Sequence, residues 1–307
     1  MKSKQHTGIF LAVLAAVLYA VNAPFSKLLL SVSVMPSTLM AGFLYWGAGL
    51  GMGILFLVRK GLHLDGAESR LTKAELPYTI AMIVLDIAAP IFLLFGLNLT
   101  SAANASLLNN FEIVATALIA LAVFREKISL RLWLGIGFVT AACAVLSLEP
   151  GQQYTLSYGS VFILLACVCW GIENNCTRKI SSKDPLQIVL LKGIFSGTGS
   201  IVIGLLLGER IGVWWSIPAV LGVGLVAYGL SIYCYVYAQR SLGAARTSAY
   251  YAIAPFIGTA LSLVIFWQLP PATYFAALAL MIVGAWLSAS DKPLFTRRKR
   301  RVAVPKS

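Results

Sequence analysis

Ten apolar runs, separated by charged or polar clusters, limit this chain to a membrane-spanning fold. A bilayer core of about 30 Å is crossed by roughly 20 apolar residues in α-helical conformation. The runs are continuous rather than alternating, which argues against transmembrane β-strands. We therefore expect an all-α integral membrane protein with ten transmembrane helices. The expected spans are 8–30, 36–58, 76–97, 102–124, 131–148, 158–178, 185–207, 217–239, 244–267 and 272–290.

The composition excludes most soluble classes of protein. Of the 307 residues, 59% are hydrophobic and 11% are charged, and the mean hydropathy is +0.84, whereas soluble domains are about a quarter charged. All five cysteines lie within apolar runs and both histidines lie outside them. Neither residue type is spaced as a metal site, so we expect no metal, no cofactor and no disulfide framework.

The distribution of Lys and Arg predicts the orientation in the membrane. With the N-terminus in the cytoplasm, all but three of the 24 cationic residues fall in cytoplasmic segments, as the positive-inside rule requires. The exceptions are Lys27 and Arg210 on the outer side and Lys192 within a span. We expect a multi-pass protein of the cell (inner) membrane with both termini cytoplasmic. Residues 291–307 form a basic cytoplasmic tail, so the net charge of +13 indicates topology and no nucleic-acid partner.

The two halves of the chain are related in sequence. An offset of 151 residues places Tyr19-Ala20 on Trp170-Gly171, and an offset of 142 places Ala102–Leu148 on Ala244–Ser290. The repeats are residues 1–148 and 158–290, with five helices each. Because five is odd, the second repeat is expected to be inverted across the membrane. Inverted repeats with a site between them are typical of secondary transporters.

The motifs of the repeats resemble those of the drug/metabolite transporter superfamily, EamA type. Each repeat opens with an aromatic-small pair, and the fourth helix of the first repeat carries Phe111-Glu112-Ile113 and then Phe124-Arg125-Glu126. The corresponding places in the second repeat hold Ala254-Pro255-Phe256 and Trp267-Gln268. The resemblance covers nearly the whole chain and implies a transporter of small metabolites. It does not indicate a particular substrate.

Four ionisable residues within the spans are candidate functional residues, because charges in a bilayer are costly and usually serve a function. Glu173 and Lys192 lie at similar depths and are expected to form an ion pair or a gate, or to contact substrate. Asp86 and Glu112 have no evident partner at their depth. A desolvated carboxyl group can exchange a proton near neutral pH, so both are expected to handle substrate or protons. The alternative for each is a protonated acid bonded to a neighbouring helix.

Polar and aromatic residues extend this candidate site. Asn109, Glu112 and Thr116 are spaced to form one polar stripe on a helix. The repeat offset places Tyr228 opposite Asp86, and its ring is suited to an amine or an aromatic solute. Trp170 is expected to close the cavity, and for each aromatic residue simple packing is the alternative. Glycines such as Gly47, Gly49 and Gly193 are expected to let helices approach closely, and Pro24, Pro90 and Pro255 to kink theirs.

Together these features predict a secondary active transporter. It is expected to move a small polar or amphiphilic metabolite, with an amine or amino acid favoured, by alternating access coupled to a proton or another cation. The sequence has no nucleophile–base pair that would suggest an enzyme. It also has no nucleotide-binding loop that would suggest ATP as the energy source. The alternatives are a neutral sugar or nucleoside carrier and, outside transport, a membrane sensor or scaffold. The expected partners are the solute, the coupling ion and the lipid bilayer, and a homodimer is left open.

Overall fold

The computed structural model describes residues 2–33, 35–62, 69–124, 129–147, 157–242, 244–267, 270 and 272–289. The predicted basic tail at 291–307, the Arg125-Glu126 pair and Gln268 lie outside these residues.

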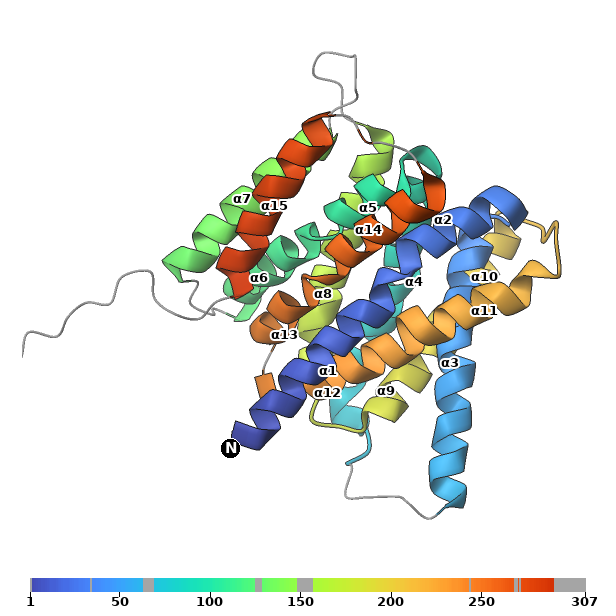
Figure 1. Cartoon of the computed structure of the whole chain (residues 1–307). Helices are drawn as coiled ribbons and strands as arrows, with labels where there is room; N and C mark the ends of the chain where they lie inside the picture. The colour runs from blue at the N-terminus through green and yellow to red at the C-terminus, as the bar shows by residue number, and fades with distance from the viewer. Residues whose placement is uncertain are drawn as a thin grey trace, which may run out of the picture.

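The described chain is a bundle of helices, which confirms the predicted all-α class (Figure 1). Seven helical segments are long and apolar enough to cross a membrane, and three shorter apolar helices accompany them. These ten segments correspond to the ten predicted runs. The helices are α1 (Lys2–Ala20), α2 (Asn22–Ser33), α3 (Ser37–Gly61), α4 (Leu76–Leu99), α5 (Ala102–Leu108), α6 (Phe111–Phe124), α7 (Leu130–Ser147), α8 (Tyr158–Ile180), α9 (Pro185–Leu191), α10 (Gly197–Leu206), α11 (Ser216–Gly224), α12 (Ser231–Leu242), α13 (Ala244–Tyr251), α14 (Ala254–Phe266) and α15 (Ala272–Ala289).

Three short non-α turns complete the secondary structure. A 3-10 turn, η1 (Lys73–Glu75), leads into α4, and two π-helical stretches, η2 (Lys192–Ser196) and η3 (Leu225–Leu230), interrupt the seventh and eighth spans. A π-helical turn adds a residue to the ordinary helical turn and is frequent at functional sites.

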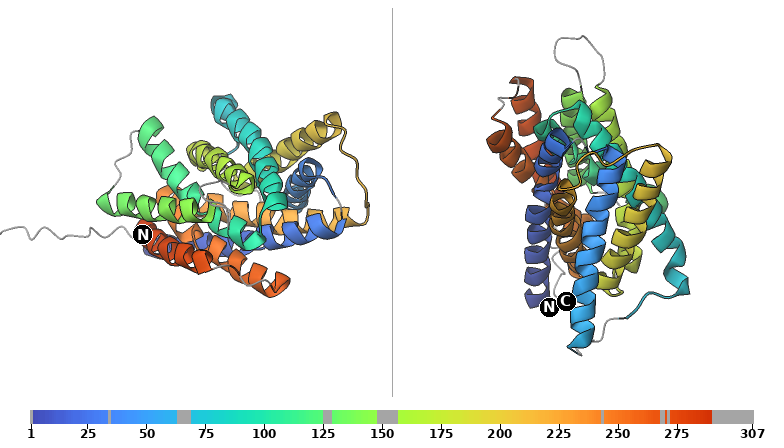
Figure 2. Two further views of the ribbon diagram at one scale, coloured as in Figure 1. Left: turned by 90° about the horizontal axis from the view of Figure 1, so that it is seen from above. Right: turned by 90° about the vertical axis from the view of Figure 1, so that its right-hand side faces the viewer.

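The two repeats pack against each other through corresponding helices. The first span of one repeat lies on the third of the other, as α1 on α12 and α4 on α8, and α5 of the first repeat packs on α14 of the second. The fifth spans, α7 and α15, lie side by side at one edge of the bundle (Figures 1 and 2). This exchange of equivalent partners is what two inverted copies of one five-helix unit produce, and it places the interface between the repeats at the centre of the molecule.

Three of the spans expected as continuous helices are broken instead: the run 8–30 is divided into α1 and α2 at Val21, and the fourth span of each repeat is divided as well. The run 102–124 is divided into α5 and α6 by a turn at Asn109-Asn110, and the run 244–267 into α13 and α14 by a turn at Ala252-Ile253. The offset of 142 residues places one turn within one residue of the other, so the break belongs to the repeated unit. Hydropathy does not reveal such breaks, because a short turn inside an apolar run leaves its composition unchanged. The helix expected to carry the stripe of Asn109, Glu112 and Thr116 is therefore interrupted at Asn109, although Asn109 and Glu112 still line one cavity and Asn174 contacts both Glu112 and Thr116.

The predicted prolines differ in their effects. Pro24 lies just after the junction of α1 and α2, and Pro255 lies in the first turn of α14. Each removes a backbone donor where a helix has been interrupted. Pro90 lies within α4, which continues through it.

Glycines permit the closest helix crossings, as predicted. A Cβ atom on Gly224 would lie 2.0 Å from the Leu44 carbonyl oxygen, and one on Gly193 would lie 2.2 Å from the Gly49 backbone nitrogen. These glycines let α3 approach α11 and the π-helical stretch η2 closely.

Candidate functional site

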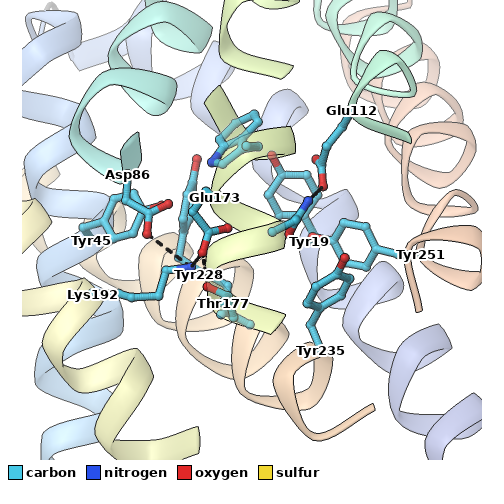
Figure 3. Close-up of a pocket in the computed structure, with 13 residues that line it drawn as sticks. Tyr19, Tyr45, Asp86, Glu112, Glu173, Thr177, Lys192, Tyr228, Tyr235 and Tyr251 are labelled. Atoms are coloured by element: carbon cyan, nitrogen blue, oxygen red, sulfur yellow. Dashed lines mark hydrogen bonds and ion pairs between the residues drawn. The ribbon is translucent and has the colours of Figure 1, made fainter. Parts of the chain in front are cut away.

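A pocket lies at the interface of the two repeats (Figure 3). Its walls come from α1, α3, α4 and α6 of the first repeat and from α8, η2, η3, α12 and α13 of the second. The cavity volume is about 40 Å³, enough for about three water molecules. The lining residues are Tyr19, Tyr45, Asp86, Glu112, Trp170, Glu173, Asn174, Thr177, Lys192, Tyr228, Ile232, Tyr235 and Tyr251.

A buried cluster of charges occupies one side of the pocket. Lys192 Nζ lies 2.7 Å from Glu173 Oε1 and 3.1 Å from Asp86 Oδ2. Tyr45 donates a hydrogen bond of 2.7 Å to Asp86 Oδ1, and Thr177 donates one to Glu173 Oε1. All three charged residues are at most 4% exposed. The cluster thus holds two carboxyl groups on one ammonium group inside the membrane span.

The cluster contains one predicted contact and one correction. The ion contact expected between Glu173 and Lys192 is present. The expectation that Asp86 lacks a partner is wrong, because Lys192 reaches it across the interface of the repeats. Depth along a helix can be read from the sequence, but which helices adjoin and which faces meet cannot.

Glu112 lies on the opposite side of the pocket, in the first turn of α6. Asn174 Nδ2 donates to Glu112 Oε1 at 2.6 Å and also lies 3.3 Å from Thr116 Oγ1. Among the described residues, no cationic side chain lies within 4.0 Å of the Glu112 carboxylate. The start of a helix carries a partial positive charge that favours a carboxylate there, so Glu112 is held by dipoles rather than by a counter-ion.

Aromatic rings separate the two acidic sides. The Tyr19 ring centroid lies 6.3 Å from that of Trp170, 6.0 Å from Tyr228 and 5.5 Å from Tyr251. Tyr228 accepts a hydrogen bond of 3.1 Å from Asn22 and packs on Tyr45, with ring centroids 4.9 Å apart. Trp170 and Tyr228 line the pocket.

The structure also adds residues that the sequence reasoning missed. Tyr19 is the repeat partner of Trp170, so the same alignment contained a signal for it. Thr177 falls on Ser26 in that alignment, whereas Tyr45 carried no signal, because a single tyrosine in an apolar helix has no distinguishing pattern. Asn109, in contrast, does not line this pocket. It lies at the turn between α5 and α6, where it lines a smaller cavity.

Ion pairs join the repeats at one end of the bundle, where the N-terminus lies in Figure 1. Arg59 at the end of α3 pairs with Asp184, which also caps α9 by accepting from Leu186 N at 3.0 Å. Glu75 pairs with Lys183 at 3.2 Å. Each pair links a residue of the first repeat to one of the second, so ion pairs bridge the two repeats at this end.

The described residues contain no cluster of three or more His, Cys, Asp or Glu side chains placed to hold a metal ion. The chemistry of the pocket is therefore that of carboxylates, one ammonium group, amides and tyrosines. Such groups bind charged or polar solutes and protons.

Comparison with known proteins identifies the family. The model of the EamA-like transporter family matches twice, at residues 6–148 and at residues 157–290. The chain belongs to the EamA-like transporter family. It is a multi-pass membrane protein, and the family match agrees with the two-repeat architecture of the fold.

Relatives of this EamA-like protein are known as transporters without an assigned solute. The chain is 26% identical to an uncharacterized transporter of Methanothermobacter thermautotrophicus over 278 residues, which cover 84% of this chain and 79% of the relative. It is 22% identical to the uncharacterized transporter YyaM of Bacillus subtilis over 228 residues, which cover 69% of this chain and 72% of the relative. A crystal structure of another protein shares the fold, with a TM-score of 0.70 at 17% identity over 96% of this chain and 99% of that one.

Proposed function

We propose that this EamA-like protein is a secondary active transporter of a small cationic or amine-bearing solute. One observation carries the proposal: the central pocket holds the carboxyl groups of Asp86, Glu112 and Glu173 against the single ammonium group of Lys192. A buried site with excess acid attracts positive charge, because unpaired carboxylates in a low-dielectric interior are costly.

Glu112 is the residue proposed to receive the amine. Its carboxylate has no cationic partner among the described residues, and it lines the pocket together with Tyr19, Tyr251 and Trp170. Aromatic faces attract ammonium groups within about 6 Å of the ring centroid. A carboxylate beside several aromatic rings is therefore suited to an amine with an apolar portion, such as an amino acid or an alkylamine.

The Asp86–Lys192–Glu173 cluster is proposed to hold the coupling proton. One ammonium group balances one of the two carboxylates, which leaves one negative charge inside the membrane span. Burial favours the neutral form of a carboxyl group, so a proton on this pair would remove the excess charge. Gain and loss of that proton would couple solute movement to the proton gradient.

Alternating access is proposed because the pocket in the structure is smaller than the proposed solute. The cavity admits water but is too small for an amino acid, and the pairs Arg59–Asp184 and Glu75–Lys183 bridge the two repeats at one end of their interface. The positive-inside rule assigns that end to the cytoplasm of the cell membrane. Opening on that side would require both cross-repeat pairs to break.

The experiment is transport by purified protein in proteoliposomes, with currents recorded on solid-supported membranes. Pools of amines, amino acids and sugars are applied with and without a pH gradient. We expect a current with an amine-bearing pool that depends on the gradient. Glu112→Gln should abolish it, whereas Glu209→Gln, which removes a carboxylate outside both the pocket and the cross-repeat ion pairs, should retain transport.

A current with sugars alone, unchanged in Glu112→Gln, would contradict the amine assignment. If the folded protein gives no current with any of the pools, that result would also count against this solute class. Radiolabelled exchange with the same pools then distinguishes an electroneutral cycle from inactivity.

A further inference from the structure

A second, smaller cavity lies beside the central pocket, where the two broken helices meet. It is bordered by the turn between α5 and α6 and by the turn between α13 and α14. Its polar lining residues are Asn109, Asn110, Glu112 and Ser248, together with Tyr19 and Tyr251. Glu112 lines both cavities, so one carboxylate faces the solute pocket and this site.

Asn110 is the observation that points to a ligand. The residue is 1% exposed, and among the described residues neither its Oδ1 nor its Nδ2 atom has a hydrogen-bond partner. The hydroxyl of the nearby Ser106 is likewise buried without a partner. Buried amides are nearly always hydrogen-bonded, so a side chain with both polar atoms unused at the wall of a cavity indicates a missing bound species.

The backbone at this cavity departs from the α-helical pattern. Asn110 N and Glu112 N donate to carbonyls three residues earlier, at 3.0 and 3.1 Å, instead of four. In the second repeat Pro255 has no N–H, so the Tyr251 carbonyl lacks the bond that it would accept in a continuous helix. Interrupted helices at the interface of inverted repeats provide carbonyl oxygens and helix ends that coordinate monovalent ions.

We propose that this second cavity binds one Na⁺ ion through the Glu112 carboxylate and the side-chain oxygens of Asn110, Asn109 and Ser248. All four groups are hard oxygen donors, which are the ligands of hard cations. A single carboxylate matches a single positive charge. The cavity volume of about 20 Å³ has room for an ion with one water molecule and no organic solute.

The proposal goes beyond the proposed transport function and rests on it only through the shared residue Glu112. Three carboxyl groups line the two cavities, and one is balanced by Lys192 and one by the coupling proton. A Na⁺ ion in the second cavity balances the third, that of Glu112, whenever the central pocket holds no cationic solute.

The test is the thermal stability of purified protein in detergent as NaCl replaces choline chloride at constant ionic strength and pH. No solute is present, so the result does not depend on transport. Because a ligand that binds only the folded state raises its stability, we expect a saturable rise in Tm with Na⁺ and none with choline. The variant Asn110→Leu, which keeps the side-chain size, should raise the half-saturating Na⁺ concentration at least tenfold.

The matched control is Asn104→Leu, which makes the same asparagine-to-leucine substitution within α5. Asn104 bonds to Thr100 Oγ1 and to the Leu146 carbonyl, away from both cavities. Its Tm in choline is expected to fall, but its response to Na⁺ should equal that of the wild type. An Asn110→Leu variant that is stabilised and still responds fully to Na⁺ would overturn the proposal.

Binding of ²²Na⁺ to the wild-type protein keeps the proposal testable if Asn110→Leu does not fold. We expect one ion per chain, displaced by unlabelled Na⁺ and not by choline. No saturable binding would mean that the cavity holds water alone. Intact Na⁺ binding in a protein that moves no amine would refute the transport proposal and leave this site standing.

Discussion

Lys192 Nζ lies 3.1 Å from Oδ2 of Asp86, so a cation of the second repeat is paired with a carboxylate halfway along a helix of the first. The same ammonium group holds Glu173 at 2.7 Å. The cluster therefore joins the two repeats at the centre of the molecule, where any change in their relative position would alter it.

Removing the cation of this cluster is expected to be strongly destabilising. Lys192→Met would leave Asp86 and Glu173 buried without a counter-ion, at a cost of about 3–5 kcal/mol. We expect a large fall in Tm by fluorescence-detected size exclusion, partly reversed by adding Asp86→Asn. Lys60→Met, at the exposed end of α3, should change Tm little. A Lys192→Met protein as stable as the wild type would show that both acids are already neutral.

Neutralising Asp86 is expected to leave the stability of the fold unchanged and to remove the coupling of transport to protons. In Asp86→Asn, Lys192 still pairs with Glu173, so the protein should insert and fold normally. The cluster would then have balanced charges and no reason to hold a proton. We expect solute flux in proteoliposomes to become equal with and without a pH gradient. A wild-type response to the gradient would place the coupling proton elsewhere.

The helix crossing at Gly224 gives a prediction about packing with an internal control. A Cβ atom there would lie 2.0 Å from the Leu44 carbonyl oxygen, whereas one on Gly222 meets nothing within 4 Å. Because backbone cannot give way as a flexible side chain can, Gly224→Ala should destabilise the protein by about 1–3 kcal/mol. Gly222→Ala should leave Tm unchanged. Equal Tm values for the two variants would show that α11 is free to move away from α3.

The sequence predicted the outline of this molecule because the bilayer imposes it. Span length and continuous apolar runs follow from the thickness of a membrane, and the offset of 142 residues is visible without coordinates. The break between Leu108 and Phe111 was not predicted, because a two-residue turn changes neither hydropathy nor length.

Side-chain partners were predicted where they depended on depth alone. Glu173 and Lys192 lie at matching distances from one end of their helices, and they do meet. Asp86 was expected to be alone because its partner depends on which helices adjoin and how each is rotated. The π-helical turn that begins at Lys192 shifts that rotation further, and periodicity based on 3.6 residues per turn does not include it.

The aromatic wall gives a prediction that separates solute recognition from packing. Trp170 lines the central pocket and not the second cavity, and its ring makes a T-shaped contact with that of Tyr19. If its ring attracts the ammonium group of the solute, Trp170→Leu should lose about 0.5–2 kcal/mol of binding, or about 2- to 30-fold in KM. Trp170→Phe keeps an aromatic face and should fall between the wild type and Trp170→Leu. The measurement is KM for the amine identified by the liposome currents, with kcat determined in parallel.

A purely structural Trp170 would give a different pattern. Loss of packing would lower Tm and kcat in both variants and leave the KM values of Trp170→Phe and Trp170→Leu alike. Trp133→Leu is the control for the exchange itself, because Trp133 is 46% exposed on α7 and lines neither cavity. Its KM should equal that of the wild type. If the aromatic face contacts the transported cation, KM should rise from the wild type to Trp170→Phe and again to Trp170→Leu. The Tm should stay nearly constant across the series.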